Sequence, residues 1–435
     1  MTRAYRFVPG AVHLLLAFLC LAPRGASGEV RSLTLPKAVE YALANNGELK
    51  ALRAEKEVAR AGLERAVLFP NPTLELAGDT GALTGSSDES TVSIGLSQEF
   101  LTGGKRAKRL SVAERETEAV HHQIADQERL LTLEVKSTFY ELMLAQKRRE
   151  LAQRAIDLNG KLLEITRERL AAGDIPELEV NLARVEVARS EGRKIGAERE
   201  FSPLLARLRT LLGFPVGDDV SFDGTPERRP LAITPDELTR LALENRPDLK
   251  TFEATRAKGD AAVELAETER IPNVTLGVGY THERSVDATG VEDEKTSDNL
   301  LGVKISIPLP LFDRNQAGIR EARARKLSAE NRLEFARTSV AREIEGDYAR
   351  LAAAEKALDL YATGILPQLE ENLKLVQEAY QLGEVGILSV IEEQKKYIEV
   401  HDGYLVALAD RQIALARLEA SVGIDFQNKT SGGAQ

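Results

Sequence analysis

The segment Phe69-Pro-Asn-Pro-Thr-Leu-Glu-Leu-Ala77 decides the fold, because the spacing of the apolar residues changes within it. A helical pattern over about 47–68 stops at its prolines, which cannot donate a backbone hydrogen bond. From Thr73 onwards apolar and polar residues alternate, as they do again in Val92-Ser-Ile-Gly-Leu-Ser97. Strict alternation indicates strands with one apolar and one polar face, so we expect a hairpin over 73–100.

The same turn returns 202 residues later as Ile271-Pro-Asn-Val-Thr275. The alternating runs that follow it predict a second hairpin over 274–309. Three further matches occur in the same order: Ala42–Lys50 with Ala242–Lys250, Glu168–Gly173 with Glu378–Gly383, and Leu212–Gly213 with Val422–Gly423. The sequence therefore predicts a duplication of one large unit, and not an array of short repeats.

The duplication sets the predicted domain boundaries. We expect repeat 1 over 29–213 and repeat 2 over 236–423. The segment 214–235 between them is rich in Pro and Gly, which is typical of a linker. Residues 424–435 are expected to form a flexible tail.

A long helical run follows each predicted hairpin. Residues 104–172 contain no proline, and residues 314–382 contain one, Pro367, at which we expect a kink. Apolar residues recur in steps of four and three, the heptad pattern of helices that wrap around one another. At 1.5 Å per residue, each run of 69 residues spans about 100 Å. From each tip a shorter return helix is expected to run back and to end near 212 or 422. It matches the length of the long run only if the medium helix before the hairpin, at about 47–68 or 247–270, stacks end to end with it.

The composition excludes several classes of protein. The chain has 435 residues with a formal net charge of −10, and 43% of them are hydrophobic, 29% charged and 5% aromatic. This is too apolar for a disordered chain and too charged for a helical membrane bundle. An acidic balance without basic clusters also argues against nucleic acid as a partner.

The N-terminus predicts export. Arg3 and Arg6 precede a short apolar run, and Ala26-Ser27-Gly28 has the small residues of a cleavage site. We therefore expect a signal peptide over 1–28, with an uncleaved membrane anchor as the alternative. Cys20 raises the question of lipidation, although Leu19 before it is larger than a lipoprotein site prefers. Cleavage before Glu29 would leave a mature chain with a charge of −13 and no cysteine.

The four predicted strands cannot form a membrane barrel alone. Open strand edges are not tolerated in lipid, and the smallest membrane barrels have about eight strands. Several copies of the chain would therefore have to share one barrel. Aromatic residues near the strand ends are placed as in the aromatic girdle of such barrels: Phe69, Phe100, Tyr280 and Phe312. The alternative is a small soluble sheet that caps a coiled coil.

Three motifs resemble the TolC-type outer-membrane efflux factors: Phe69–Pro72, Glu99-Phe-Leu-Thr-Gly-Gly-Lys-Arg106 and Leu309-Pro-Leu-Phe-Asp-Arg-Asn-Gln316. The last two look most like the CzcC-like branch that serves heavy-metal cation pumps. The resemblance covers nearly the whole mature chain and implies a mainly α fold with membrane β-strands. It further implies a homotrimer whose 12-stranded barrel lies in outer-membrane lipid and whose coiled-coil tunnel extends into the periplasm.

The resemblance also implies a function, namely a passive export duct of a tripartite efflux system. A periplasmic adaptor and an inner-membrane pump would be its partners, and heavy-metal cations its cargo. The expected adaptor contacts lie at the two helical tips: Leu170, Gly173, Leu178, Gly383, Gly386 and Leu388. We expect Gly173 and Gly383 to adopt the left-handed turn that ends a helix.

A pore constriction is expected just after the second tip. The family places a pair of acids there, and this chain has Ser389 at the first position and Glu392 at the second. Three copies of Glu392 around a narrow pore would favour cations. The alternative is that Glu392 and Glu393 are solvated helix charges.

The sequence predicts no catalytic, cofactor or metal site, and hence no enzyme. His121 and His122 are adjacent, so on a helix they point about 100° apart and do not chelate. Nucleotide-binding, metalloprotease and serine-hydrolase motifs are absent from the sequence. Two alternatives stay open: a type I protein-secretion or drug-efflux duct of the same fold, and a soluble periplasmic coiled-coil adaptor or scaffold.

Overall fold

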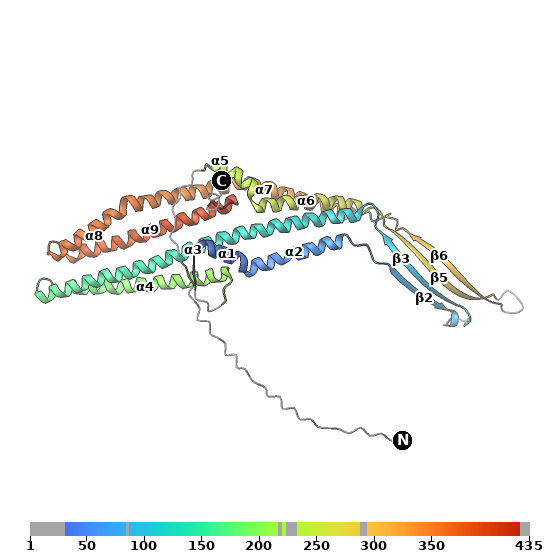
Figure 1. Ribbon diagram of the computed structural model, residues 1–435, viewed down its shortest axis with the longest axis horizontal. Coiled ribbons are helices and arrows are strands. Elements are labelled where there is room, and N and C mark those ends of the chain that lie inside the picture. Colours follow the sequence, from blue (N-terminus) through green and yellow to red (C-terminus); the bar gives the residue numbers. More distant parts are fainter. Residues whose placement is uncertain (1–30, 84–86, 216–219, 223–232, 288–293, 427–435) are drawn as a thin grey trace, which may run out of the picture.

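The computed structural model describes residues 31–83, 87–215, 220–222, 233–287 and 294–426. These residues form a long rod of helices with a narrow sheet at one end and two helical tips at the other (Figure 1). The predicted signal peptide, with Cys20, lies outside the described residues. No helix in the described part of the chain is long and apolar enough to cross a membrane.

Both halves of the chain contain the same order of elements. The first half has β1 (Arg31–Leu33), α1 (Leu35–Asn45), α2 (Gly47–Ala66), β2 (Thr73–Thr80), a 3₁₀ turn (Gly81–Leu83), β3 (Ser90–Phe100), α3 (Lys105–Ala172) and α4 (Glu177–Leu212). The second half has β4 (Val220–Phe222), α5 (Pro235–Asn245), α6 (Pro247–Thr268), β5 (Val274–Asp287), β6 (Glu294–Ser306), α7 (Gln316–Asp359), α8 (Leu366–Gln381) and α9 (Ile387–Val422).

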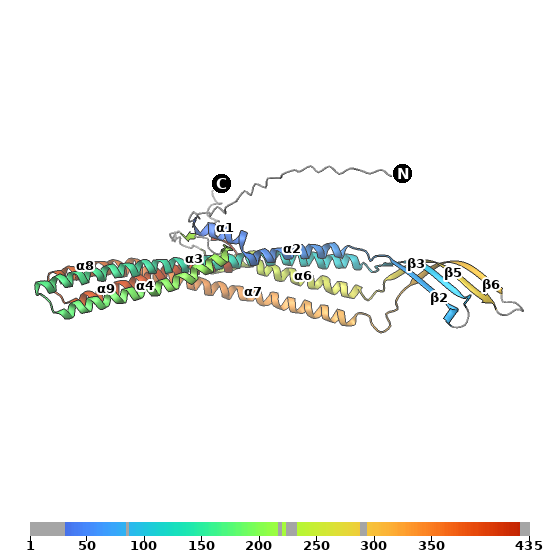
Figure 2. The same ribbon diagram turned by 90° about the horizontal axis from the view of Figure 1, so that it is seen from below.

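The helices pack side by side in a single curved layer (Figure 2). Towards the sheet the layer runs α2, α3, α6, α7, and towards the tips it contains α3 with α4 and α8 with α9. The end of α4 meets the start of α2, where the Asn46 side-chain amide donates to the Leu211 carbonyl at 2.9 Å. The predicted end-to-end stacking of medium and return helices is therefore confirmed in the first repeat.

The four long strands form one antiparallel sheet in the order β2-β3-β5-β6. The alternating runs of the sequence predict strands of about seven to eleven residues, but β5 has 14 residues and β6 has 13. The prediction ended each strand where its apolar residues end. The ladder continues through polar residues to the pair Asp287 and Glu294, because it requires only backbone hydrogen bonds. The second hairpin also ends at Ser306, three residues before the predicted boundary at 309.

The second long run is not one α-helix with a kink at Pro367. A π-helical turn, Leu360–Ile365, separates α7 from α8, and Pro367 lies in the first turn of α8. A proline ring clashes with the carbonyl four residues earlier, here that of Thr363. That carbonyl lies in the wider π turn, so the departure from α-helical geometry occurs before the proline and not at it.

Parts of the predicted linker and tail are described and packed, while 216–219, 223–232 and 427–435 lie outside the described residues. Within 214–235, β4 pairs in parallel with β1, and the ring of Phe222 packs edge-on against Phe139 at 5.9 Å between centroids. At the C-terminus, Ile424 and Phe426 pack against the core formed by α5, α7 and α9. The first residues of the predicted flexible tail therefore belong to the packed structure.

Candidate functional site

One face of the sheet is apolar and exposed. Cross-strand register places Leu74, Leu96, Val278 and Val303 in one row, and Leu76, Ile94, Tyr280 and Leu301 in the next. Their exposed fractions range from 44% for Tyr280 to 85% for Leu301. So many exposed apolar side chains on one face indicate contact with lipid or with a large apolar partner.

The opposite face of the sheet is polar. Its register row contains Thr73, Ser97, Gly277 and Lys304, and the Ser97 hydroxyl donates to the Glu75 carboxylate at 3.3 Å. Apolar residues on one face and polar residues on the other are the pattern of a sheet between lipid and water.

Both outer strands of this sheet have an open edge. Within the described residues, β2 pairs only with β3, and β6 pairs only with β5. Unpaired backbone groups cannot be left in lipid. A membrane location therefore requires strands from further copies at both edges.

The two tips have the predicted backbone geometry. Gly173 and Gly383 adopt left-handed conformations, with φ of 83° and 79°. The amides that follow close the helix ends, since Asp174 donates to the Arg169 carbonyl and Glu384 to the Ala379 carbonyl, both at 2.9 Å. The expected left-handed turns are therefore confirmed.

The predicted contact residues lie together at this end of the rod. Leu178 and Leu388 start the return helices α4 and α9 and are 66% and 65% exposed. Leu170 is half-buried, whereas Gly386 is exposed and has an extended backbone with φ of −82°. The tips thus present two matching leucines to solvent, and their role in adaptor contact stays a prediction.

A contact between the tips was not predicted. The Tyr380 side chain is only 1% exposed, and its hydroxyl donates to the Glu179 carboxylate at 3.1 Å. The Arg169 guanidinium stacks over the Tyr380 ring at 4.9 Å and donates to the Tyr380 carbonyl at 2.8 Å. Burial, followed by the hydrogen bond and charge of Glu179, raises the pKa of Tyr380 to about 12. The sequence signal for this contact was that Arg169 lies four residues before Gly173 and Tyr380 lies three residues before Gly383.

Glu392 lies on the second turn of α9 with its side chain 71% exposed. Lys396, one helical turn further on, approaches it at 3.3 Å and approaches Glu393 at 3.6 Å. Both carboxylates raise the pKa of Lys396, Glu392 the more strongly. Ser389 is exposed in the preceding turn. The pore-constriction role of Glu392 stays a prediction.

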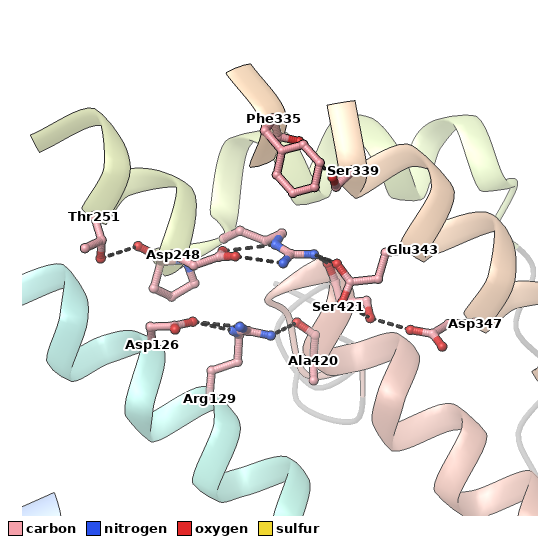
Figure 3. Close-up of polar contacts among 12 residues, drawn as sticks. Asp126, Arg129, Asp248, Thr251, Phe335, Ser339, Glu343, Asp347, Ala420 and Ser421 are labelled. Atoms are coloured by element: carbon pink, nitrogen blue, oxygen red, sulfur yellow. Dashed lines mark hydrogen bonds and ion pairs between the residues drawn. The ribbon is translucent and has the colours of Figure 1, made fainter. Parts of the chain in front are cut away.

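A network of buried charges joins four helices near the middle of the rod (Figure 3). Arg246, only 6% exposed, donates to Asp248 at 2.7 and 3.0 Å and to Glu343 at 2.6 Å. It also donates to the Ser421 carbonyl at 3.1 Å, and the Ser421 hydroxyl donates to Asp347 at 2.5 Å. Burial alone would raise the pKa of Asp248, but the hydrogen bond and charge of Arg246 lower it.

The same network reaches α3 through Arg129, which pairs with Asp126 and donates to the Ala420 carbonyl at 2.7 Å. A groove of about 890 Å³ lies beside the network between α6 and α7. Phe252, Leu327 and Phe335 supply its apolar lining. Since Leu327 is 57% exposed and Phe335 72% exposed, this edge of the helical layer is unfilled in the single chain.

The histidines make ordinary contacts. The rings of His121 and His122 lie 5.5 Å apart and tilted by 59°, and His282 contacts the Asn299 side chain at 2.9 Å. Among the described residues, no three His, Cys, Asp or Glu side chains form a group that could hold a metal ion.

Comparison with known proteins agrees with this geometry. The family model described as "Outer membrane efflux protein" matches residues 38–214 and 238–424, which confirms the predicted duplication. The chain is 26% identical over 402 residues to the cobalt-zinc-cadmium resistance protein CzcC of Cupriavidus metallidurans, covering 92% of each chain. It is 26% identical over 336 residues to the nickel-cobalt-cadmium resistance protein NccC of Alcaligenes xylosoxydans xylosoxydans, covering 76% of this chain and 74% of that protein.

A solved structure of CusC shares the fold, with a TM-score of 0.72 and 18% identity over 90% of this chain and 92% of that one. The matched family model spans most of both halves of the chain. The chain therefore belongs to the outer membrane efflux protein family, and it is an efflux channel of the outer membrane that extends into the periplasm.

Proposed function

We propose that this chain is the passive outer-membrane duct of a tripartite system that exports heavy-metal cations. The observation that carries the proposal is a sheet with one apolar face and two open edges, joined directly to long helices with exposed tips. The duct has no cofactor and performs no catalysis. An inner-membrane pump supplies the energy, and a periplasmic adaptor binds the tips.

The open edges require further copies of the chain, and we propose three. Three chains of four strands give 12 strands, enough to close a barrel without a free edge. Each β6 edge then pairs with the β2 edge of the next copy. This contact is head-to-tail, and it closes into a ring through rotation.

The helices that continue these edge strands have matching unpartnered surfaces. On α2 the exposed residues Ala51, Ala54, Val58 and Ala61 recur at heptad spacing. On α7 the exposed residues Ala324, Leu327, Asn331 and Phe335 recur in steps of three, four and four. Since α2 and α7 are the outer helices of the layer, closing the ring brings one stripe against the other.

The cargo proposal draws on the named relatives and on acidic groups. Two relatives are named for resistance to cobalt and cadmium, one also for zinc and the other for nickel. In a trimer the exposed Glu392 contributes three carboxylates near the tip, which favours cations over anions.

A deletion strain tests the function. We expect it to lose tolerance to zinc, cobalt, cadmium or nickel, and plasmid-borne wild-type protein to restore it. The same strain is tested against a panel of drugs. Unchanged metal tolerance with reduced drug tolerance would assign the duct to drug export, and recovery of the protein from the soluble periplasm without detergent would refute the duct itself.

A further inference from the structure

Four segments connect the sheet to the helices, and an exposed arginine and exposed apolar side chains lie in or beside each of them. The arginines are Arg65 in the last turn of α2, Arg106 in the first turn of α3, and Arg270 and Arg314 in the segments before β5 and after β6. The apolar partners are Leu68, Phe69, Phe100, Ile271, Leu309 and Phe312, which are 45% to 91% exposed. We call these ten residues the collar.

Contacts across the segments place the collar at one level of the molecule. The Arg106 guanidinium lies 4.5 Å from the centre of the Phe69 ring, joining the first two segments. The Thr102 hydroxyl donates to the Pro272 carbonyl at 2.5 Å, joining the second to the third. The Asn315 amide donates to the Ala266 carbonyl at 2.8 Å, joining the fourth to α6.

The collar lies at the helical edge of the apolar sheet face. Along the last strand and beyond it, every second residue is exposed and apolar: Leu301, Val303, Ile305, Ile307, Leu309 and Leu311. The strand β6 ends at Ser306, so the first three of these residues lie on the sheet and the last three lie in the segment that connects it to α7. Arg314 follows three residues after the last of these apolar residues.

The charge of the collar region differs from that of the chain. Segments 65–72, 98–109, 269–273 and 307–320 contain eight basic and three acidic residues, although the whole chain has a net charge of −10. Among the described residues, the four collar arginines form no ion pair with a carboxylate; Arg106 stacks on Phe69, and Arg314 donates to the Pro310 carbonyl. At the far end of the sheet the balance reverses, with acidic residues such as Asp79, Glu89, Glu283 and Asp298.

We propose that the collar binds the phosphate headgroups of anionic glycerophospholipids in the leaflet of the outer membrane that faces the periplasm. A guanidinium donates two parallel hydrogen bonds to a phosphate, and basic residues beside a bilayer attract anionic lipid. The exposed aromatic and aliphatic side chains of the collar contact the first carbons of the acyl chains. The proposal rests on the membrane location of the sheet and is independent of the cargo and of the pump.

Native mass spectrometry of the delipidated, detergent-solubilised protein tests this. Dioleoyl phosphatidylglycerol and dioleoyl phosphatidylcholine are titrated separately, and bound lipids are counted per oligomer. We expect phosphatidylglycerol to bind about tenfold or more tightly than phosphatidylcholine, and the difference to shrink at high salt because exposed charges are screened. Equal binding of the two lipids by the wild-type protein would overturn the proposal.

Variants locate the lipid site. Replacing Arg65, Arg106, Arg270 and Arg314 by Gln is expected to abolish the preference for phosphatidylglycerol, whereas replacing them by Lys retains most of it. The matched control replaces four exposed arginines of the helical rod by Gln: Arg154, Arg167, Arg193 and Arg199. If this control loses the preference for phosphatidylglycerol to the same extent, the preference depends on net charge and not on the collar, and the proposal is refuted. If the collar variant does not assemble, the comparison of the two lipids on the wild-type protein still tests the proposal. Detergent sizing of the wild-type protein shows whether the oligomer has formed, so that failure of the proposed oligomer is distinguished from absence of lipid selectivity.

Discussion

At the scale of single residues, the tip glycines differ in how strongly the backbone favours glycine. Gly383 has φ of 79°, and a Cβ there would meet the Arg169 guanidinium at 3.4 Å. Gly386, three residues on, has φ of −82°, and a Cβ there would meet nothing within 4 Å. The two positions therefore form a matched pair for testing the tip.

We expect Gly383→Val to weaken coupling to the pump while the trimer persists. A branched residue in the left-handed region costs about 1–2 kcal/mol, and this strain acts only on the tip. Metal tolerance of the complemented deletion strain should fall, whereas Gly386→Ala should retain it. Loss of the oligomer on detergent sizing of Gly383→Val would contradict this prediction.

Two buried tyrosines predict a loss of stability in alkali. Burial is the main cause that raises the pKa of both Tyr140 and Tyr380 to about 12, above the ordinary value of 10.0 for a tyrosine. Between pH 10 and 12 the folded state retains these protons and the unfolded state releases them, so stability falls as pH rises through this window. The Tyr140→Phe, Tyr380→Phe double variant should show a shallower fall in its thermal midpoint from pH 10 to 12. An unchanged slope would show that these phenols do not contribute.

At the scale of elements, buried charges hold the helices of the two repeats together. Arg246 at the start of α6 joins α7 through Glu343 and α9 through Ser421, while Arg129 joins α3 to the end of α9. Lys136 on α3 and Glu419 on α9 add a buried ion pair at 2.7 Å. The middle of the rod thus depends on charge pairs between helices as well as on apolar packing.

Arg246→Gln is expected to destabilise the protein by about 3 kcal/mol, because it leaves Asp248 in a mostly buried site without its counter-charge. The control is Arg240→Gln, whose side chain is 62% exposed in its pairs with Glu237 and Glu244 and which should cost under about 1 kcal/mol. Thermal or denaturant unfolding followed by circular dichroism measures both. Similar midpoints for the two variants would contradict the prediction.

At the scale of the whole molecule, the single chain is incomplete. Its sheet has two open edges, and the helical layer ends in unpartnered stripes on α2 and α7. The largest side chain on the α7 stripe is Phe335, 72% exposed, and the largest on the α2 stripe is Val58, 60% exposed. Both lie between the middle of the rod and the sheet, where a neighbouring copy would bury them.

Cysteine pairs test the head-to-tail ring, because Cys20 is the only cysteine of the chain and lies in the predicted signal peptide. Phe335→Cys is combined in turn with Ala54→Cys, Val58→Cys and Ala61→Cys. We expect at least one pair to give covalent dimers and trimers on non-reducing gels. Phe335→Cys with Leu178→Cys, at the distant tip, is the control and should stay monomeric. Absence of a cross-link from all three pairs in a protein that sizes as a trimer would refute this interface.

Local patterns determined much of the architecture. Proline turns, alternating apolar residues and heptads placed the hairpins and the long helices, and Gly173 and Gly383 ended the rods as expected. These features depend on backbone conformation and on residues a few positions apart, which a sequence displays directly. The ends of the strands were predicted less well, because they depend on backbone pairing between strands. The π turn before Pro367 was not predicted, because it depends on how the preceding helical turn widens to accommodate the proline ring.

The sequence by itself determined the duplicated unit, its hairpins and rods, and the turns of its tips. Only the tertiary structure decided which charges are buried, since Lys136 and Glu419 are separated by 283 residues and resemble ordinary surface charges in the sequence. It also decided the link between Tyr380 and Glu179, which are separated by 201 residues. The physical reason is that desolvation and charge pairing depend on what covers a side chain, and that covering comes from distant parts of the chain.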